Sequence, residues 1–136
     1  MNKERIYFIM KNFIFISACL LSLMGNAQAR IGSKAQAILD EFQGEDIEFL
    51  YGDKGNAFIL FKIDEFIEVY YYLREDSICT STLIVTNSQE ATDKIINNYN
   101  EKGYLKTDTG WLLRGNDIIV KINYALVNGQ GLFYWE

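Results

Sequence analysis

The chain has 136 residues, lacks histidine and proline, and carries 13 basic and 18 acidic side chains, a formal net charge of −5. This balance argues against nucleic acids and anionic membrane surfaces as partners, because both attract a positively charged protein surface. Without histidine the chain lacks the commonest general base, the commonest metal ligand and the imidazole of a nucleophile pair.

The first 29 residues contain the three parts of a secretory signal peptide in order. Lys11 gives a positive start, an apolar run follows over residues 13–24, and Ala27-Gln28-Ala29 supplies the small residues of a cleavage site. The apolar run is too short to span a bilayer, which needs about 20 residues. We therefore predict that residues 1–29 are cleaved after Ala29, that the protein is exported (periplasmic or secreted), and that no stable membrane span remains.

Three alternatives concern the same segment. The residues Ile16-Ser17-Ala18-Cys19 resemble a bacterial lipobox, so a lipoprotein anchored at Cys19 is the alternative to cleavage. Retention of the apolar run as an anchor is the second alternative. The third is translation from Met10 instead of Met1, which would still leave a complete leader.

Residues 30–136 are numerous enough for a single domain with its own core. Removing the leader leaves ten basic and seventeen acidic residues, a net charge of −7, which suits a basic protein as the partner. Only Cys79 remains, so no disulfide can form within the mature chain. We expect a small buried side chain there, on the same strand face as Leu83 and Val85, with a disulfide between two chains as the alternative.

Capping residues and hydrophobic periodicity predict two helices and eight strands. The first helix is expected to begin at a Ser33 cap and to end at Gly44, and the second to begin at an Asn87 cap and to end at Gly103. Strands are expected at residues 46–51, 57–62, 66–73, 78–86, 104–107, 110–114, 117–125 and 131–135.

One helix followed by four strands occurs twice, which suggests an internal duplication. The possible half-units are residues 30–86 and 87–136. A gapless offset of 53 residues sets Phe58 against Trp111 and aligns the apolar alternation of the two long strands.

The predicted fold class is therefore α+β. We expect tandem units of one helix and a four-stranded antiparallel sheet, with the helices packed on one sheet face. This order resembles, in topology alone, the tandem helix-plus-sheet modules of β-lactamase-inhibitor-like and PepSY-like periplasmic proteins, and the likeness implies no site residues. A single cystatin-like or barrel-like unit is the alternative.

Alternation along the strands predicts a face that could bind a partner. On the strand at 66–73 we expect odd-numbered residues to face the helices and even-numbered residues to face away. On the strand at 57–62 we expect Phe58 and Leu60 to point inward. The outward residues, our candidate partner-binding face, are Ile59, Phe61, Glu68, Tyr70 and Tyr72. In the second half the outward face is expected to be more polar, with Leu112, Arg114, Lys121 and Asn123. The alternative is that the first face is covered by the other sheet, a terminus or a second copy.

The sequence contains few patterns that point to catalysis. It has no phosphate-binding Gly-Lys-Ser/Thr loop and no dinucleotide fingerprint, and one cysteine without histidine cannot form a usual zinc site, so we expect no metal and no cofactor. Carboxylate pairs such as Asp64 and Glu65 leave a carboxylate-only hydrolase as the enzymatic alternative.

We therefore predict a small exported non-enzymatic binding protein that holds a protein partner on the aromatic sheet face, in the manner of an inhibitor or immunity protein. The alternative function is an envelope accessory module that binds a small ligand, peptide or glycan between the sheet and the helices.

Overall fold

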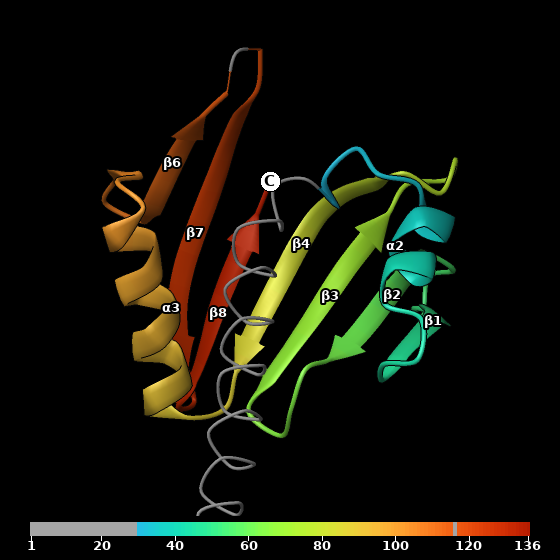
Figure 1. Ribbon diagram of the computed structural model, residues 1–136, viewed down its shortest axis with the longest axis horizontal. Helices are drawn as coiled ribbons and strands as arrows, with labels where there is room; N and C mark the ends of the chain where they lie inside the picture. The colour runs from blue at the N-terminus through green and yellow to red at the C-terminus, as the bar shows by residue number, and fades with distance from the viewer. Residues whose placement is uncertain (1–29, 116) are drawn as a thin grey trace, which may run out of the picture.

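The computed structural model describes residues 30–115 and 117–136. These residues form two helices and an eight-stranded antiparallel open sheet, the α+β class that the sequence predicted (Figure 1). The predicted signal peptide, its cleavage by a peptidase and the alternative anchor at Cys19 concern residues outside the described part. No helix among the described residues is long and apolar enough to cross a membrane.

Every predicted strand is present, with its ends within two residues of the predicted bounds. In chain order the elements are α2 (Ala35–Glu41), β1 (Ile47–Tyr51), β2 (Ala57–Lys62), β3 (Ile67–Leu73), β4 (Cys79–Thr86), α3 (Gln89–Glu101), β5 (Leu105–Lys106), β6 (Gly110–Arg114), β7 (Ile119–Val127) and β8 (Gln130–Trp135).

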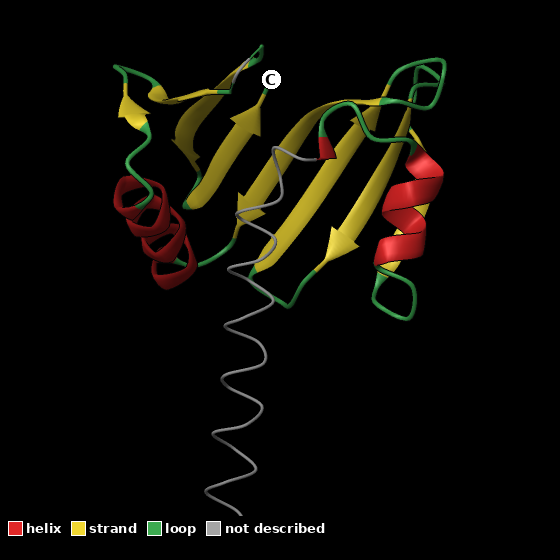
Figure 2. Cartoon of the chain, turned by 45° about the horizontal axis from the view of Figure 1, so that its top comes forward, coloured by secondary structure: helices red, strands yellow, loops and turns green. Residues whose placement is uncertain are grey.

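The strands lie in the order β1-β2-β3-β4-β8-β7-β6-β5. Strands β1 to β4 follow one another as hairpins, and β5 to β8 do the same. The two groups meet where β4 pairs with β8, with Leu83 opposite Tyr134. Figure 2 shows the strands as one curved layer. The joint between β4 and β8 therefore brings together residues about 50 positions apart in the sequence.

The gapless alignment of the two halves fails across the first hairpin. Val69 and Ile122, which the offset of 53 aligns, lie opposite Phe61 and Trp111 respectively. Phe61 and Trp111 are only 50 residues apart, so the hairpin of β6 and β7 is three residues longer than that of β2 and β3. As a consequence Phe58, which the offset set against Trp111, lies on one face of the sheet and Trp111 lies on the other.

Helix α2 does not begin at Ser33 as predicted. Its N-cap residue is Lys34, which makes no side-chain cap hydrogen bond. The backbone of the preceding segment is instead paired with the start of β4, because Gly32 donates to the Cys79 carbonyl at 2.7 Å and Cys79 donates to the Ser33 carbonyl at 2.9 Å. This tertiary pairing sets where the helix begins.

Helix α3 begins one residue later than predicted. The N-cap residue is Ser88, whose side chain accepts a hydrogen bond from the backbone of Ala91 at 3.1 Å. The Asn87 amide oxygen, predicted as the cap, accepts from Gln130 at 2.6 Å and so connects the helix start to β8. The helix ends at Glu101, two residues before Gly103, which has a φ of 70°.

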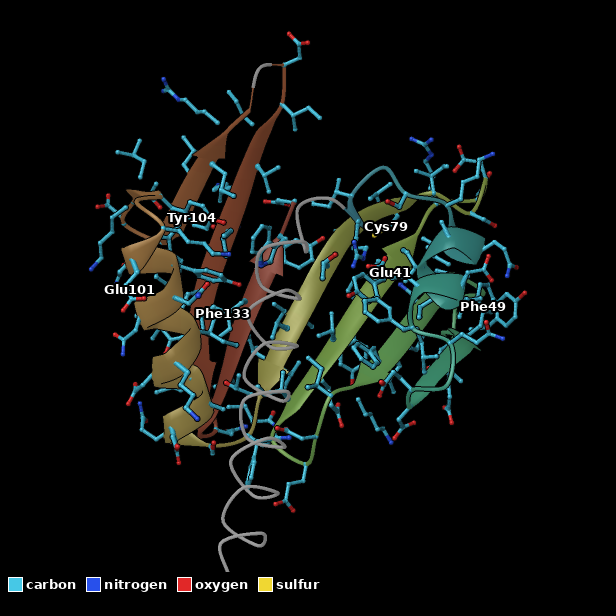
Figure 3. All side chains as sticks on the ribbon, in the orientation of Figure 1. Glu41, Phe49, Cys79, Glu101, Tyr104 and Phe133 are labelled. Atoms are coloured by element: carbon cyan, nitrogen blue, oxygen red, sulfur yellow. The ribbon has the colours of Figure 1, made fainter. Side chains whose placement is uncertain are left out.

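The core lies on one face of the sheet, which we call the buried face. A row of buried side chains crosses six strands in register: Ile59, Tyr71, Thr82, Trp135, Ile122 and Trp111. Tyr99 of α3 packs edge-on against Phe133 with ring centroids 5.8 Å apart, and Figure 3 labels Phe133 beside this helix. Phe42, which follows α2, stacks on Phe61 at 4.6 Å.

Cys79 is buried, as predicted, but it does not share a face with Leu83 and Val85. Tyr72 pairs with Ser81 and Leu73 pairs with Cys79, so an extra residue bulges from β4 between them. The bulge turns Cys79 to the buried face, where it is 1% exposed, while Leu83 and Val85 lie on the other face. Burial raises the pKa of the Cys79 thiol, which keeps it protonated and disfavours thiol exchange.

Candidate functional site

The candidate site is an apolar area on the sheet face opposite the core. Leu60, Tyr70, Leu83 and Tyr134 lie opposite one another in a row through β2, β3, β4 and β8. Flanking rows pair Phe58 with Tyr72 and Val85 with Leu132. We call these eight half-buried side chains the outer face: Phe58, Leu60, Tyr70, Tyr72, Leu83, Val85, Leu132 and Tyr134.

Two of the five predicted site residues do not belong to the outer face. Ile59 and Phe61 are 0% and 4% exposed, and they lie opposite Tyr71 and Val69 on the buried face. The outward prediction was wrong because β2 is apolar on both faces, so alternation alone does not say which set points inward. Phe58 and Leu60, which were expected to point inward, occupy the outer face instead.

The turn between β2 and β3 decides the orientation of β2. Ile63 donates a backbone hydrogen bond to Ile67 at 3.0 Å, which makes these two residues the closing pair of the hairpin. Asp64 stabilises the turn, since its carboxylate accepts from the backbone of Phe66 at 2.7 Å and of Ile67 at 2.9 Å. Residues 59, 61, 63 and 67 must then share a face. The aspartate was therefore the sequence signal that could have set the orientation of β2.

The other three predicted residues, Glu68, Tyr70 and Tyr72, alternate with the buried residues of β3 and are half-buried. Tyr70 and Tyr72 stack with ring centroids 6.4 Å apart, and Phe58 lies 6.0 Å from Tyr70 and 6.2 Å from Tyr72. The three rings form a cluster across β2 and β3. Aromatic side chains held in this way offer large contact area at a low entropic cost.

Tyr70 is held by its neighbour on the same strand face. Its hydroxyl donates a hydrogen bond to the Glu68 carboxylate at 2.8 Å. Burial, followed by this hydrogen bond and the charge of Glu68, raises the pKa of Tyr70 to about 12. The hydroxyl therefore stays protonated at neutral pH and the Glu68 carboxylate keeps its hydrogen-bond donor.

We expect Glu68→Gln to lower the pKa of Tyr70, because the substitution removes a negative charge next to the phenolate. Part of the increase should persist, since burial is its main cause. Ultraviolet titration of each protein, with its Tyr70→Phe derivative subtracted, would measure the change. An unaltered Tyr70 titration would contradict the contact. The pKa of Tyr70 in the folded protein lies above the ordinary value of 10.0. The contribution of protonated Tyr70 to the free energy of unfolding is therefore complete below pH 10 and is lost as the pH rises through about 12.

The second half of the sheet is more polar on this side. Leu112 and Asn123 are half-buried, and Arg114 and Lys121 are exposed. The Asn123 amide donates to Glu136 at 3.3 Å and accepts from the Thr109 hydroxyl at 3.0 Å. The apolar area therefore lies over β2, β3, β4 and β8. Sequence reasoning missed its β4 and β8 members: Leu83, Val85, Leu132 and Tyr134.

The carboxylates of the described residues give no centre for metal chemistry, since no three Asp, Glu or Cys side chains gather there as a metal site would require. Asp64, half of the carboxylate pair considered above, is engaged by two backbone amides of its own turn.

Comparison of the chain with protein-family models, with curated proteins and with solved structures found no match.

Proposed function

We propose that the protein is a small exported non-enzymatic binding protein that holds a protein partner on the outer face. The observation that carries this proposal is the row of Leu60, Tyr70, Leu83 and Tyr134, which continues without a charged residue across four adjacent strands. A contiguous apolar area of this kind usually marks an interaction surface, and tyrosine is enriched among residues that dominate binding energy.

The proposal requires both helices to lie on the buried face, so that neither of them covers the outer face. Ring contacts support this arrangement. The ring centroids of Tyr99 in α3 and Trp135 lie 5.5 Å apart, and those of Phe42, just after α2, and Phe61 lie 4.6 Å apart. The side chains of Trp135 and Phe61 both lie on the buried face. The positions of α2 and α3 in Figures 1 and 2 agree with it.

We also propose that the two halves arose by duplication. The strand order supports this, because β1 to β4 and β5 to β8 mirror one another about the β4–β8 joint. Tyr71 and Tyr124, aligned by the offset of 53, both have the orientation of the buried face. Under this proposal the extra residues of the second hairpin are an insertion.

The proposal includes export, because residues 1–29 have the pattern of a signal peptide. The contacts of Arg30, the first residue after the predicted cleavage site, are compatible with cleavage after Ala29. Arg30 is 8% exposed, its guanidinium forms an ion pair with Glu41, and it lies 5.2 Å from the ring centroid of Phe42. A mature chain that starts at Arg30 would keep these contacts.

The partner that suits this surface is a basic protein. The mature chain carries a net charge of −7, and Glu48 and Glu68 flank the apolar row. Opposite charge steers the encounter while the apolar row supplies contact area. An inhibitor or immunity protein, which blocks its target by occupying it, fits these requirements without any catalytic group.

Affinity capture tests the proposal. Protein purified from cells expressing the full chain is immobilised and exposed to the exported fraction of the same cells. Wild type should retain a specific protein, and the double variant Tyr70→Ala/Tyr72→Ala should lose it. The matched control Phe66→Ala/Leu126→Ala removes two exposed apolar side chains away from the outer face and should retain it. Equal retention by the outer-face variant, with circular dichroism unchanged, would refute the proposed site.

A further inference from the structure

Among the residues that the structure describes, no further strand pairs with the edge at β1, and this edge is a second surface that the outer face does not include. β1 is the first strand of the sheet, and the opposite edge is the two-residue β5. Phe49 and Tyr51 are 37% and 71% exposed, and their rings meet edge-to-face at 5.4 Å. Figure 3 labels Phe49 at this margin of the sheet. Exposed edge strands normally carry devices that prevent further pairing.

The hydrogen bonds at the two ends of β1 show which backbone groups point outward. Asp46 accepts from Lys62 at 2.9 Å, and Gly52 donates to Asn56 at 2.8 Å. Alternate residues of an antiparallel strand direct their backbone N–H and C=O groups to the same neighbouring strand. The backbone groups of the even-numbered residues 46 to 52 therefore point toward β2. The backbone groups of Ile47, Phe49 and Tyr51 therefore point away from the sheet.

Most of these outward groups have no partner among the described residues. Outside the β1–β2 pairing, the one recorded backbone hydrogen bond of these three residues joins the Ile47 amide to Glu45 at 2.9 Å. The amides of Phe49 and Tyr51 and the carbonyl of Ile47 remain ready to pair with another strand. Proline and a bulge, which would block such pairing, are absent from β1.

We propose that β1 pairs antiparallel with β1 of a second copy of this chain, about a two-fold axis at Phe49. In this register Phe49 lies opposite Phe49 of the second copy, and Tyr51 lies opposite Ile47 of the second copy. All residues of the strand are paired, and the outward amides of Phe49 and Tyr51 in each copy gain carbonyl acceptors. The two sheets become one continuous sheet.

The pattern of side chains favours a second copy over an unrelated peptide. In the proposed register Glu48 lies opposite Leu50 of the second copy, so the two Glu48 side chains do not face each other. A register centred on Glu48 would place like charges opposite each other, which is destabilising. Ile47, Phe49 and Tyr51 point to one side and would meet the same three residues of the second copy. The strand can thus pair with itself while Phe49 meets Phe49 and the two Glu48 side chains stay apart.

The inference is independent of the proposed partner on the outer face. The two-fold axis is perpendicular to the sheet, so the outer faces of both copies remain on the same side and stay uncovered. A dimer without a captured partner would leave this inference intact, and a captured partner on a monomer would leave the proposed function intact.

A cysteine crosslink tests the register directly. The protein is purified from cells expressing the full chain with Phe49→Cys, oxidised, and run on a non-reducing gel. Directly opposite hydrogen-bonded residues have Cα atoms about 5.5 Å apart, which suits a disulfide, so a covalent dimer is expected. Tyr51→Cys is the matched control. Its two copies would be about 14 Å apart along the strands, by the rise per residue, and should not crosslink.

Charge exchange tests whether the pairing forms in solution. Phe49→Glu and Phe49→Lys should each weaken the dimer by about tenfold or more, because like charges then lie opposite each other. An equimolar mixture of the two should recover the dimer in sedimentation velocity, which shows that both variants are folded. Ile119→Glu, which alters another exposed apolar residue, should remain dimeric. A monomeric wild type, a Phe49→Glu variant that dimerises as tightly as wild type, or equal crosslinking at both cysteine positions would overturn the proposal.

Discussion

Tyr99→Ala is expected to lower the free energy of unfolding by about 3–5 kcal/mol, a large part of the roughly 5–15 kcal/mol that stabilises a typical domain. Tyr99 is 0% exposed and lies at the centre of the aromatic cluster between α3 and the sheet. Its ring centroid lies 5.1 Å from Trp111, 5.8 Å from Phe133 and 5.5 Å from Trp135. Removing the ring would leave a cavity that three rigid neighbours could not close.

Tyr99→Phe separates packing from hydrogen bonding. The Trp135 indole donates to the Tyr99 hydroxyl at 3.1 Å, so the phenylalanine variant keeps the ring but leaves a buried donor without its acceptor. Such a group costs about 1–3 kcal/mol. Urea unfolding of wild type and both variants would measure the differences. Equal losses for alanine and phenylalanine would contradict the primary role of ring packing.

Gly110→Ala is expected to cost about 3 kcal/mol or more, at the upper end of the usual cost of overpacking. A Cβ atom at this position would lie 1.9 Å from the carbonyl oxygen of Ile122 and 3.2 Å from the Cα of Asn123. Both contacts are with backbone, which cannot move aside as a flexible side chain can. β6 and β7 would have to separate where Trp111 enters the core.

Gly129→Ala is the control for this effect. Apart from Gly129 and its two chain neighbours, no heavy atom of the described residues lies within 4 Å of a Cβ at this position, although its φ of 79° makes alanine unfavourable there by about 1–2 kcal/mol. Thermal and urea unfolding should therefore rank Gly110→Ala as clearly more damaging than Gly129→Ala. The reverse order would contradict the close approach of β6 to β7.

The sequence predicted the elements well, because the information for them is local. Turn residues and alternating apolar residues specify where a strand begins and ends, as for β2 and β6, whose predicted bounds match the structure. The helix starts were less accurate. Ser33 has the chemistry of a cap, but its backbone pairs with Cys79, a contact that depends on the tertiary fold.

The candidate site was predicted only in part, for two physical reasons. β2 is apolar on both faces, so its pattern could not show that Ile59 and Phe61 are buried. The joint between β4 and β8 is a long-range pairing that leaves no local pattern in the sequence. Tyr134 therefore could not be assigned to the same surface as Tyr70, although the two share one row.

The measurement that tests the central proposal most directly is the affinity of the captured partner for three versions of the protein. The double variant Tyr70→Ala/Tyr72→Ala should bind at least about 100-fold more weakly than wild type, because each tyrosine of a binding hot spot contributes on the order of 2 kcal/mol. The control Phe66→Ala/Leu126→Ala should bind as wild type does, and circular dichroism should be the same for all three. An unchanged dissociation constant for the Tyr70→Ala/Tyr72→Ala protein would contradict the assignment of the outer face as the binding surface.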